Sequence, residues 1–239
     1  MDFSKMYNLE GQVAVVVGGA RDLGFDMAAI LADAGCDLVI TSRSRQRAVE
    51  AAAKLGAQYG REVLADELDI CDHARVNALA KKVRDWKGRV DILINNAGIM
   101  IDDDIESLDV ASVRLQFEVN ALGPLNIALA FRKRLRRNSK LVNISSRLGS
   151  VGDNESGGDF GYRMSKAAQN MLTSNLAIDL GDEGIVVVAA HPGIVASNMT
   201  GGKGIPSNEV ARDLRATIEQ LSAEATGRFI DRFGKELPW

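Results

Sequence analysis

Short apolar runs alternate with longer segments of helical spacing along the whole chain, and this alternation limits the possible folds more than any other feature. The apolar runs are residues 12–17, 37–41, 63–68, 90–95, 140–145 and 185–190. Continuous apolarity is typical of strands that are covered on both faces. Between the first two runs, Met27, Ile30, Leu31 and Ala34 recur on one helix face. The pattern predicts an α/β fold, a doubly wound parallel sheet of Rossmann-like type that binds ligands at the carboxyl ends of its strands.

No proline- or serine-rich linker interrupts this alternation, so residues 1–239 are expected to form a single domain. The chain is 46% hydrophobic, enough for one sizeable core. Two glycine-rich segments, 149–161 and 199–207, are predicted to be irregular loops near a site.

The formal charge of -3 lacks the basic excess that nucleic acids or anionic membranes attract. No signal segment or long apolar stretch is visible, so a cytoplasmic location is expected. Cys36 and Cys71 form no motif, and neither a disulfide framework nor a metal site is indicated. The acidic residues 102–104 are predicted to lie in a solvated loop, and the basic run 132–137 on the last turn of a helix.

The stretch VVVGGARDLGFD, which begins at Val15, indicates a strand, a glycine-rich loop and the start of a helix. A helix N-terminus offers free N–H groups and a positive dipole end to a pyrophosphate. Gly18 and Gly24 are six residues apart, which differs from the usual dinucleotide-binding spacing, so the loop alone is a weak signal. Asp22 tolerates left-handed backbone and can cap the helix, or it can repel the pyrophosphate.

Nucleotide choice depends on the residues that follow the second strand. Ser42 and Arg43 stand where a carboxylate would bind a ribose 2′-hydroxyl. Arg21 and Arg43 can instead converge on a 2′-phosphate, which guanidinium groups bind through paired hydrogen bonds. This favours NADP(H) over NAD(H), unless both arginines are merely solvated.

Tyr162 and Lys166 lie four residues apart on a predicted helix, hence one turn apart on one face. A nearby ammonium lowers the pKa of a phenol from about 10 and thereby makes it a usable general acid or base. The pair is commonplace by itself and gains weight only from the motifs around it.

Several motifs together resemble the short-chain dehydrogenase/reductase family over essentially the whole chain. They are Val17 to Gly24, Asn95-Asn96-Ala97-Gly98, Asn120, Ser145-Ser146, Tyr162 with Lys166, and Pro192-Gly193. The resemblance implies catalysis by Asn120, Ser146, Tyr162 and Lys166. Tyr162 would exchange a proton with the substrate oxygen that Ser146 polarises, while Lys166 would hold the nicotinamide ribose and Asn120 a water.

The resemblance also implies the cofactor contacts. The phosphates would be surrounded by Gly18, Arg21, Asp22, Leu23, Gly24, Ser42 and Arg43. The adenine would contact Asp69 and Ile70, and the adenosine ribose would contact Asn96, Ala97 and Gly98. The nicotinamide would contact Pro192, Gly193, Ile194 and Ser197.

The chain departs from the family pattern in three places. Val17 replaces a threonine whose hydroxyl braces the loop, Asp22 replaces a glycine, and the segment between Ser146 and Tyr162 is longer than usual. The second half is similar to small carbonyl-reductase-like and C-factor-like members. The first half resembles gluconate and sugar dehydrogenases or 3-oxoacyl-carrier-protein reductases.

We therefore expect a cytoplasmic oxidoreductase that moves a hydride between a nicotinamide, preferably NADPH, and a ketone, aldehyde or secondary alcohol. A small-molecule substrate and a homodimer or homotetramer are expected, with neither nucleic acid nor membrane as partner. The alternatives are a nucleotide-binding signalling or regulatory protein without turnover, a 3-oxoacyl-carrier-protein reductase, and an isomerase or dehydratase.

Overall fold

The computed structural model describes residues 8–239, which contain a seven-stranded sheet whose neighbouring strands are all parallel. The strands are β1 (Val13–Val17), β2 (Asp37–Ser42), β3 (Val63–Glu67), β4 (Val90–Asn95), β5 (Leu135–Ile144), β6 (Val186–His191) and β7 (Phe229–Asp231). Their order is β3-β2-β1-β4-β5-β6-β7, which confirms the doubly wound parallel sheet. The sequence pattern missed β7 because three residues are too few to show a period.

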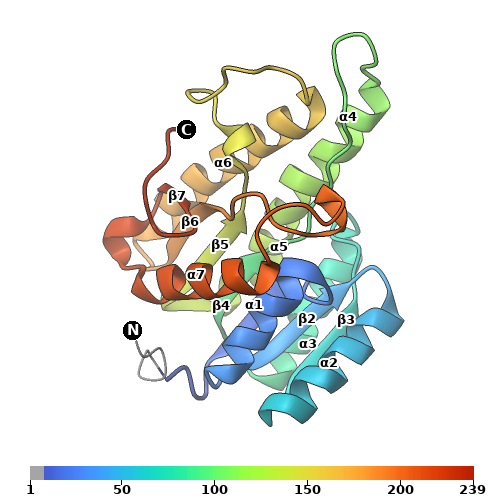
Figure 1. The fold of residues 1–239 in the computed structure, drawn as a ribbon. Helices are drawn as coiled ribbons and strands as arrows, with labels where there is room; N and C mark the ends of the chain where they lie inside the picture. The colour runs from blue at the N-terminus through green and yellow to red at the C-terminus, as the bar shows by residue number, and fades with distance from the viewer. Residues whose placement is uncertain (1–7) are drawn as a thin grey trace.

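Helices cover both faces of the sheet (Figure 1). They are α1 (Asp22–Asp33), α2 (Arg45–Tyr59), α3 (His73–Trp86), α4 (Val110–Phe117), α5 (Gly123–Phe131), α6 (Phe160–Gly181) and α7 (Ser207–Gln220). Alternate strand residues face opposite layers: Ala14 and Val16 belong to the core under α1, α2 and α7, whereas Val15 and Val17 belong to the core under α3, α5 and α6. Burial on both faces explains why the strands read as continuous apolar runs.

The strand order reverses between β1 and β4, where the loops at the carboxyl ends diverge in opposite directions. In open α/β sheets, ligands bind in the crevice at this switch point. The glycine loop follows β1, and the segment that begins at Asn96 follows β4. The irregular segments 150–159 and 201–206 follow β5 and β6 on the same edge, as the glycine-rich composition predicted.

The basic run 132–137 is not the last turn of a helix, so that prediction is wrong. Helix α5 ends at Phe131, Arg132–Arg134 form a 3₁₀ turn, and β5 begins at Leu135. Leu135 is buried and pairs with Val90 of β4, which draws the second half of the run into the sheet. Arg132 forms an ion pair with Glu183 at 3.0 Å.

Within residues 8–239, the helices are too short or too polar to span a lipid bilayer.

Candidate active site

The first turns of α6 bring Tyr162 and Lys166 together beside the end of β5. Both side chains are buried, with 7% and 4% of their surface exposed. A hydrogen bond joins the Tyr162 hydroxyl to Ser146, and Lys166 Nζ lies 5.8 Å from the centre of the Tyr162 ring. The predicted acid, the predicted polarising hydroxyl and the predicted lysine therefore form one cluster.

Burial sets the proton affinities in this cluster. Loss of hydration raises the pKa of Tyr162 to about 12, against a smaller lowering effect of the Ser146 hydrogen bond. Burial also lowers the pKa of Lys166 to about 7. The expected lowering of the tyrosine pKa by the lysine is not found, because the effect of burial dominates. Tyr162 is thus a protonated phenol, as a proton donor to a ketone requires.

Lys166 is held by two oxygen atoms. Its Nζ donates to Ile144 O and to Gln169 Oε1, each at 2.9 Å. Ile144 is the last residue of β5, so one hydrogen bond comes from the sheet and the other from α6 itself. Ammonium groups have three donors, so one N–H remains for a ligand.

Asn120 lies in a π-helical turn, Glu118–Leu122, that links α4 to α5. Its amide accepts from Ile99 N at 2.9 Å and donates to Ile99 O at 2.8 Å and to Ser165 Oγ at 3.0 Å. A side chain added at Gly98 would put a Cβ 3.2 Å from Asn120 Oδ1 and 3.7 Å from Lys166 Nζ. The asparagine and the lysine therefore face each other across a glycine.

Gln116 repeats this arrangement one turn earlier, and the sequence reading missed it. Its amide accepts from Ile101 N at 3.0 Å and donates to Ile101 O at 3.2 Å. The two amides, four residues apart on the helix, grip residues 99 and 101 of the segment after β4. The four-residue spacing of Gln116 and Asn120 is the signal that could have revealed the pair.

Asp103 is a second missed residue and corrects the prediction that residues 102–104 form a solvated loop. It is only 8% exposed, and its carboxylate accepts hydrogen bonds from the N–H groups of Phe160 and Gly161, the latter at 3.1 Å. Asp102 and Asp104 remain exposed. A carboxylate from a distant loop therefore caps the helix that carries Tyr162.

Gly18 is anchored on both sides of its peptide. Its N–H donates to Thr41 Oγ1 at 3.1 Å, and its carbonyl accepts from Asn96 Nδ2 at 3.2 Å. The Thr41 hydroxyl on β2 thus supplies the brace that Val17 cannot. At Gly24, an added Cβ would lie 2.1 Å from Gly18 O, so only glycine fits this turn.

Helix α1 begins without a side-chain cap, since Arg21, the flanking residue, supplies none. Asp22 has φ +47°, which confirms the left-handed conformation, but it is the first helical residue and not the cap. Its carboxylate lies 3.8 Å from Arg21 Nε. An uncapped helix N-terminus at the switch point suits a pyrophosphate, so the loop fits a dinucleotide.

The remaining predicted cofactor residues lie at the carboxyl ends of neighbouring strands. Ser42 ends β2, Asp69 and Ile70 follow β3, Ala97 follows β4, and Pro192, Gly193, Ile194 and Ser197 follow β6. Arg43 is exposed, and Arg21 is half exposed.

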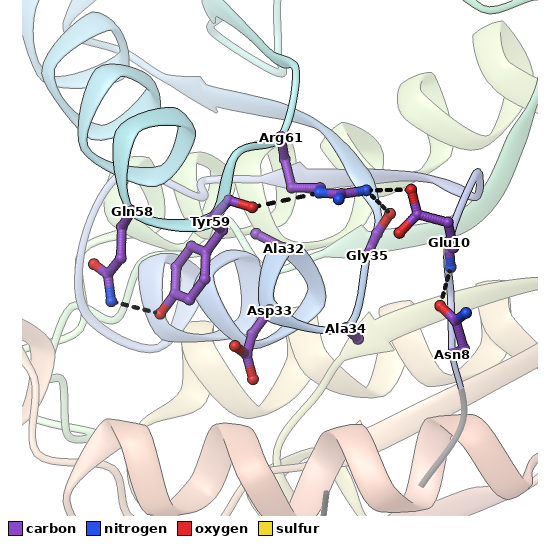
Figure 2. A pocket seen from close by; sticks show the side chains of 9 residues that line it. All are labelled: Asn8, Glu10, Ala32, Asp33, Ala34, Gly35, Gln58, Tyr59 and Arg61. Atoms are coloured by element: carbon purple, nitrogen blue, oxygen red, sulfur yellow. Dashed lines mark hydrogen bonds and ion pairs between the residues drawn. The ribbon is translucent and has the colours of Figure 1, made fainter. Parts of the chain in front are cut away.

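Two surface pockets differ in their relation to this edge. One of about 480 Å³ adjoins the glycine loop and is lined by Ala20, Arg21, Asp22 and Phe25 together with residues of α2 and Ser207. Another, of about 320 Å³, lies at the amino-terminal edge of the strands, where Arg61 donates to Glu10 and Gly35 (Figure 2). Neither pocket is lined by Asn120, Ser146, Tyr162 or Lys166.

Known proteins share both the sequence and the fold. The sequence model of the short chain dehydrogenase family matches residues 12–206. The 1-hydroxy-2-glutathionyl-2-methyl-3-butene dehydrogenase of Rhodococcus sp. strain AD45 is 35% identical over 232 residues, 94% of this chain and 98% of that protein. C-signal of Myxococcus xanthus is 40% identical over 156 residues, 64% of this chain and 94% of that protein.

Among solved structures, NADPH-bound carbonyl reductase from chicken fatty liver aligns with a TM-score of 0.88 and 29% identity, covering 97% of this chain and 100% of that one. More distant relatives include a 3-oxoacyl-[acyl-carrier-protein] reductase and a 2-dehydro-3-deoxy-D-gluconate 5-dehydrogenase, which confirms the mixed resemblances within one family. The chain belongs to the short-chain dehydrogenase/reductase family and is an NAD(P)-dependent oxidoreductase.

Proposed function

We propose that this protein reversibly reduces a ketone or aldehyde to an alcohol with NADPH, using Tyr162 as the general acid and base. The observation that carries the proposal is the buried cluster of Tyr162, Ser146 and Lys166 at the carboxyl edge of the sheet. The bound nicotinamide supplies or accepts the hydride. Residues 1–239 are taken as one domain that does both binding and catalysis.

The chain's own groups manage the substrate oxygen. Ser146 and Tyr162 both present hydroxyls, so a carbonyl oxygen placed between them accepts two hydrogen bonds and receives the Tyr162 proton as negative charge develops. Lys166 uses its remaining N–H to hold the nicotinamide ribose, and its positive charge favours the phenolate after proton transfer. Asn120 holds a water that reprotonates the pair.

Preference for NADP(H) rests on charge. The end of β2 is followed by Arg43 and carries no carboxylate, and Arg21 lies in the glycine loop after β1. Guanidinium groups bind a phosphate more strongly than they bind a hydroxyl. The NADPH in the similar chicken carbonyl reductase supports the same choice.

We also propose a homodimer or homotetramer built on exposed apolar stripes. Met164, Met171 and Ile178 recur every seven residues on α6 and are 51%, 63% and 74% exposed. Leu115, Leu122 and Leu129 repeat the spacing on the adjoining α4 to α5 segment. Sedimentation of Met171→Glu should show a smaller assembly than the wild type, whereas unchanged sedimentation would remove the stripes from the interface.

A signalling role without turnover is the second candidate, and the 40% identity to C-signal favours it. The assembled Tyr162, Ser146, Lys166 and Asn120 set favours the enzyme instead, because a pure nucleotide-binding protein has no use for a buried phenol–lysine pair. A 3-oxoacyl-carrier-protein reductase would use the same reaction as the proposed enzyme and would differ only in its substrate.

The deciding experiment is a screen of ketones, aldehydes and secondary alcohols with NADPH and NADH, on the wild type and Tyr162→Phe. Turnover should fall by at least about a hundredfold in the variant. Binding of NADP⁺ by calorimetry should persist. Equal turnover in both proteins would refute the mechanism, and binding without turnover on any substrate would favour the signalling candidate.

A further inference from the structure

Gln169 touches the catalytic lysine from within α6. It lies three residues after Lys166, is fully buried, and accepts a hydrogen bond from Lys166 Nζ at 2.9 Å. Its own Nε2 is buried and has no hydrogen-bond partner in the described part of the chain. An unpartnered buried N–H group costs about 1–3 kcal/mol, so the amide pays for its hydrogen bond to Lys166 with an unsatisfied donor at its other end.

The Gln169 amide orients the ammonium group of Lys166. Ile144 O and Gln169 Oε1 occupy two of the three N–H donors of Lys166. Tetrahedral geometry then fixes the direction of the third N–H. Gly98 leaves space on the side of Nζ toward Asn120, since a Cβ there would already lie 3.7 Å from Nζ.

A neutral acceptor also preserves the charge of the lysine. A carboxylate at this position would cancel the positive field at Tyr162, whereas a carbonyl oxygen solvates the ammonium without a compensating charge. Among the described residues, Asp159 raises the pKa of Tyr162 from the loop before α6, whereas no charged side chain shifts the pKa of Lys166, which burial lowers. The amide therefore meets no competing charge at the lysine.

We propose that Gln169 is a positioning residue that aims the free N–H of Lys166 at the cofactor ribose and keeps the ammonium charged. This rests on the proposed function of Tyr162 and Lys166. Gln169 makes no contact with Tyr162 that would give it a direct part in proton transfer, so its influence passes through Lys166.

Gln169→Leu removes the acceptor with little change of shape. We expect NADP⁺ affinity to fall about tenfold by calorimetry, because a hydrogen bond to a charged group is lost. The pH of half-maximal alcohol oxidation should rise by about half a unit or more, because the phenolate is less well stabilised. Gln169→Glu keeps the acceptor, so affinity should stay within about threefold while the pH still rises.

Thr173→Val is the matched control on the same buried helix face. Thr173 Oγ1 donates to Gln169 O and accepts from Asn143 Nδ2, each at 2.8 Å, without reaching Lys166. Its loss should lower the urea midpoint but leave NADP⁺ affinity and the pH profile unchanged. If Gln169→Leu fails to fold, Gln169→Met replaces it, and Gln169→Glu still tests the pH shift.

Unchanged affinity and pH profile in Gln169→Leu or Gln169→Met would overturn the proposal, as would equal shifts in Thr173→Val. These outcomes require a wild type that binds NADP⁺ and loses turnover in Tyr162→Phe. Failure of that wild-type behaviour would count against the proposed function instead, so the two failures are distinguishable.

Discussion

Helices α1 and α6 both start at the carboxyl edge of the sheet beside an aspartate with left-handed backbone, yet their first N–H groups meet different partners. Asp22 in α1 has φ +47°, and Asp159 before α6 has φ +46°. The N–H groups of α6 are closed by the buried carboxylate of Asp103. Those of α1 have no side-chain cap.

The difference shows how one edge can serve two purposes. An N-terminus without a side-chain cap retains its affinity for an anion, so under the proposed function the pyrophosphate would bind at α1. A helix N-terminus that a carboxylate already caps has no free N–H groups for an anion. The cap also fixes the first turn of α6, which carries Tyr162 at its third position. The predictions below disturb one helix start at a time, from the largest expected effect to the smallest.

Gly24→Ala should damage the open helix start most. Its Cβ would lie 2.1 Å from Gly18 O and 2.6 Å from Asn96 Nδ2, so the loop must shift. We expect a loss of about 3 kcal/mol in the free energy of unfolding and little NADP⁺ binding. Gly181→Ala, where an added Cβ meets nothing within 4 Å and the backbone has no positive φ, controls for glycine substitution in general. Normal NADP⁺ affinity in Gly24→Ala would contradict the close packing of the loop.

Asp103→Ala should open the closed helix start. Two N–H groups lose their carboxylate, so the free energy of unfolding should fall by about 2 kcal/mol in urea titrations. Turnover should fall while NADP⁺ affinity, which depends on α1, stays near that of the wild type. Exposed Asp102 provides the control. If Asp102→Ala and Asp103→Ala behave alike, the cap contributes nothing specific.

Arg43→Ala and Arg21→Ala should each weaken NADP⁺ binding about tenfold, equivalent to about 1.4 kcal/mol. NAD⁺ binding should hardly change, because it lacks the 2′-phosphate. The ratio of the two dissociation constants measures this directly. Arg45→Ala, a neighbouring exposed arginine, should leave the ratio alone. Parallel losses for both nucleotides would mean that the arginines act on the pyrophosphate.

Asp22→Asn should have the smallest effect, a gain of about threefold in NADP⁺ affinity, since a negative charge leaves the open helix start while the shape is kept. Asp22→Gly should match or exceed it, because glycine adopts positive φ without strain. A loss of affinity in either variant would show that the Asp22 carboxylate supports the loop.

Local periodicity predicted the sheet and its helices. The glycine loop and the set of Asn120, Ser146, Tyr162 and Lys166 were inferred from several motifs that together resemble one family, because the spacing of Tyr162 and Lys166 is commonplace by itself. The missed residues depend on contacts between distant segments. Asp103 meets α6 some 57 residues later, and Gln116 meets a backbone segment 15 residues earlier. No periodicity encodes such contacts.

The same limit explains the basic run and Gln169. The charges of residues 132–137 resemble a helix end, but the burial of Leu135 against β4 decides the outcome. Gln169 reads as an ordinary helix residue until the fold shows its amide on the catalytic lysine.

The two amides that grip residues 99 and 101 also fix how this stretch can change in length. Asn120 bonds to the backbone of Ile99, and Gln116 bonds to the backbone of Ile101. The two amides are one helix turn apart, and the two backbone partners are two residues apart. One inserted residue between them would turn one of the two peptides away from its amide. We therefore expect insertions to be accommodated beyond Asp103, in the exposed stretch 104–109, and to be disruptive between Gly98 and Asp103.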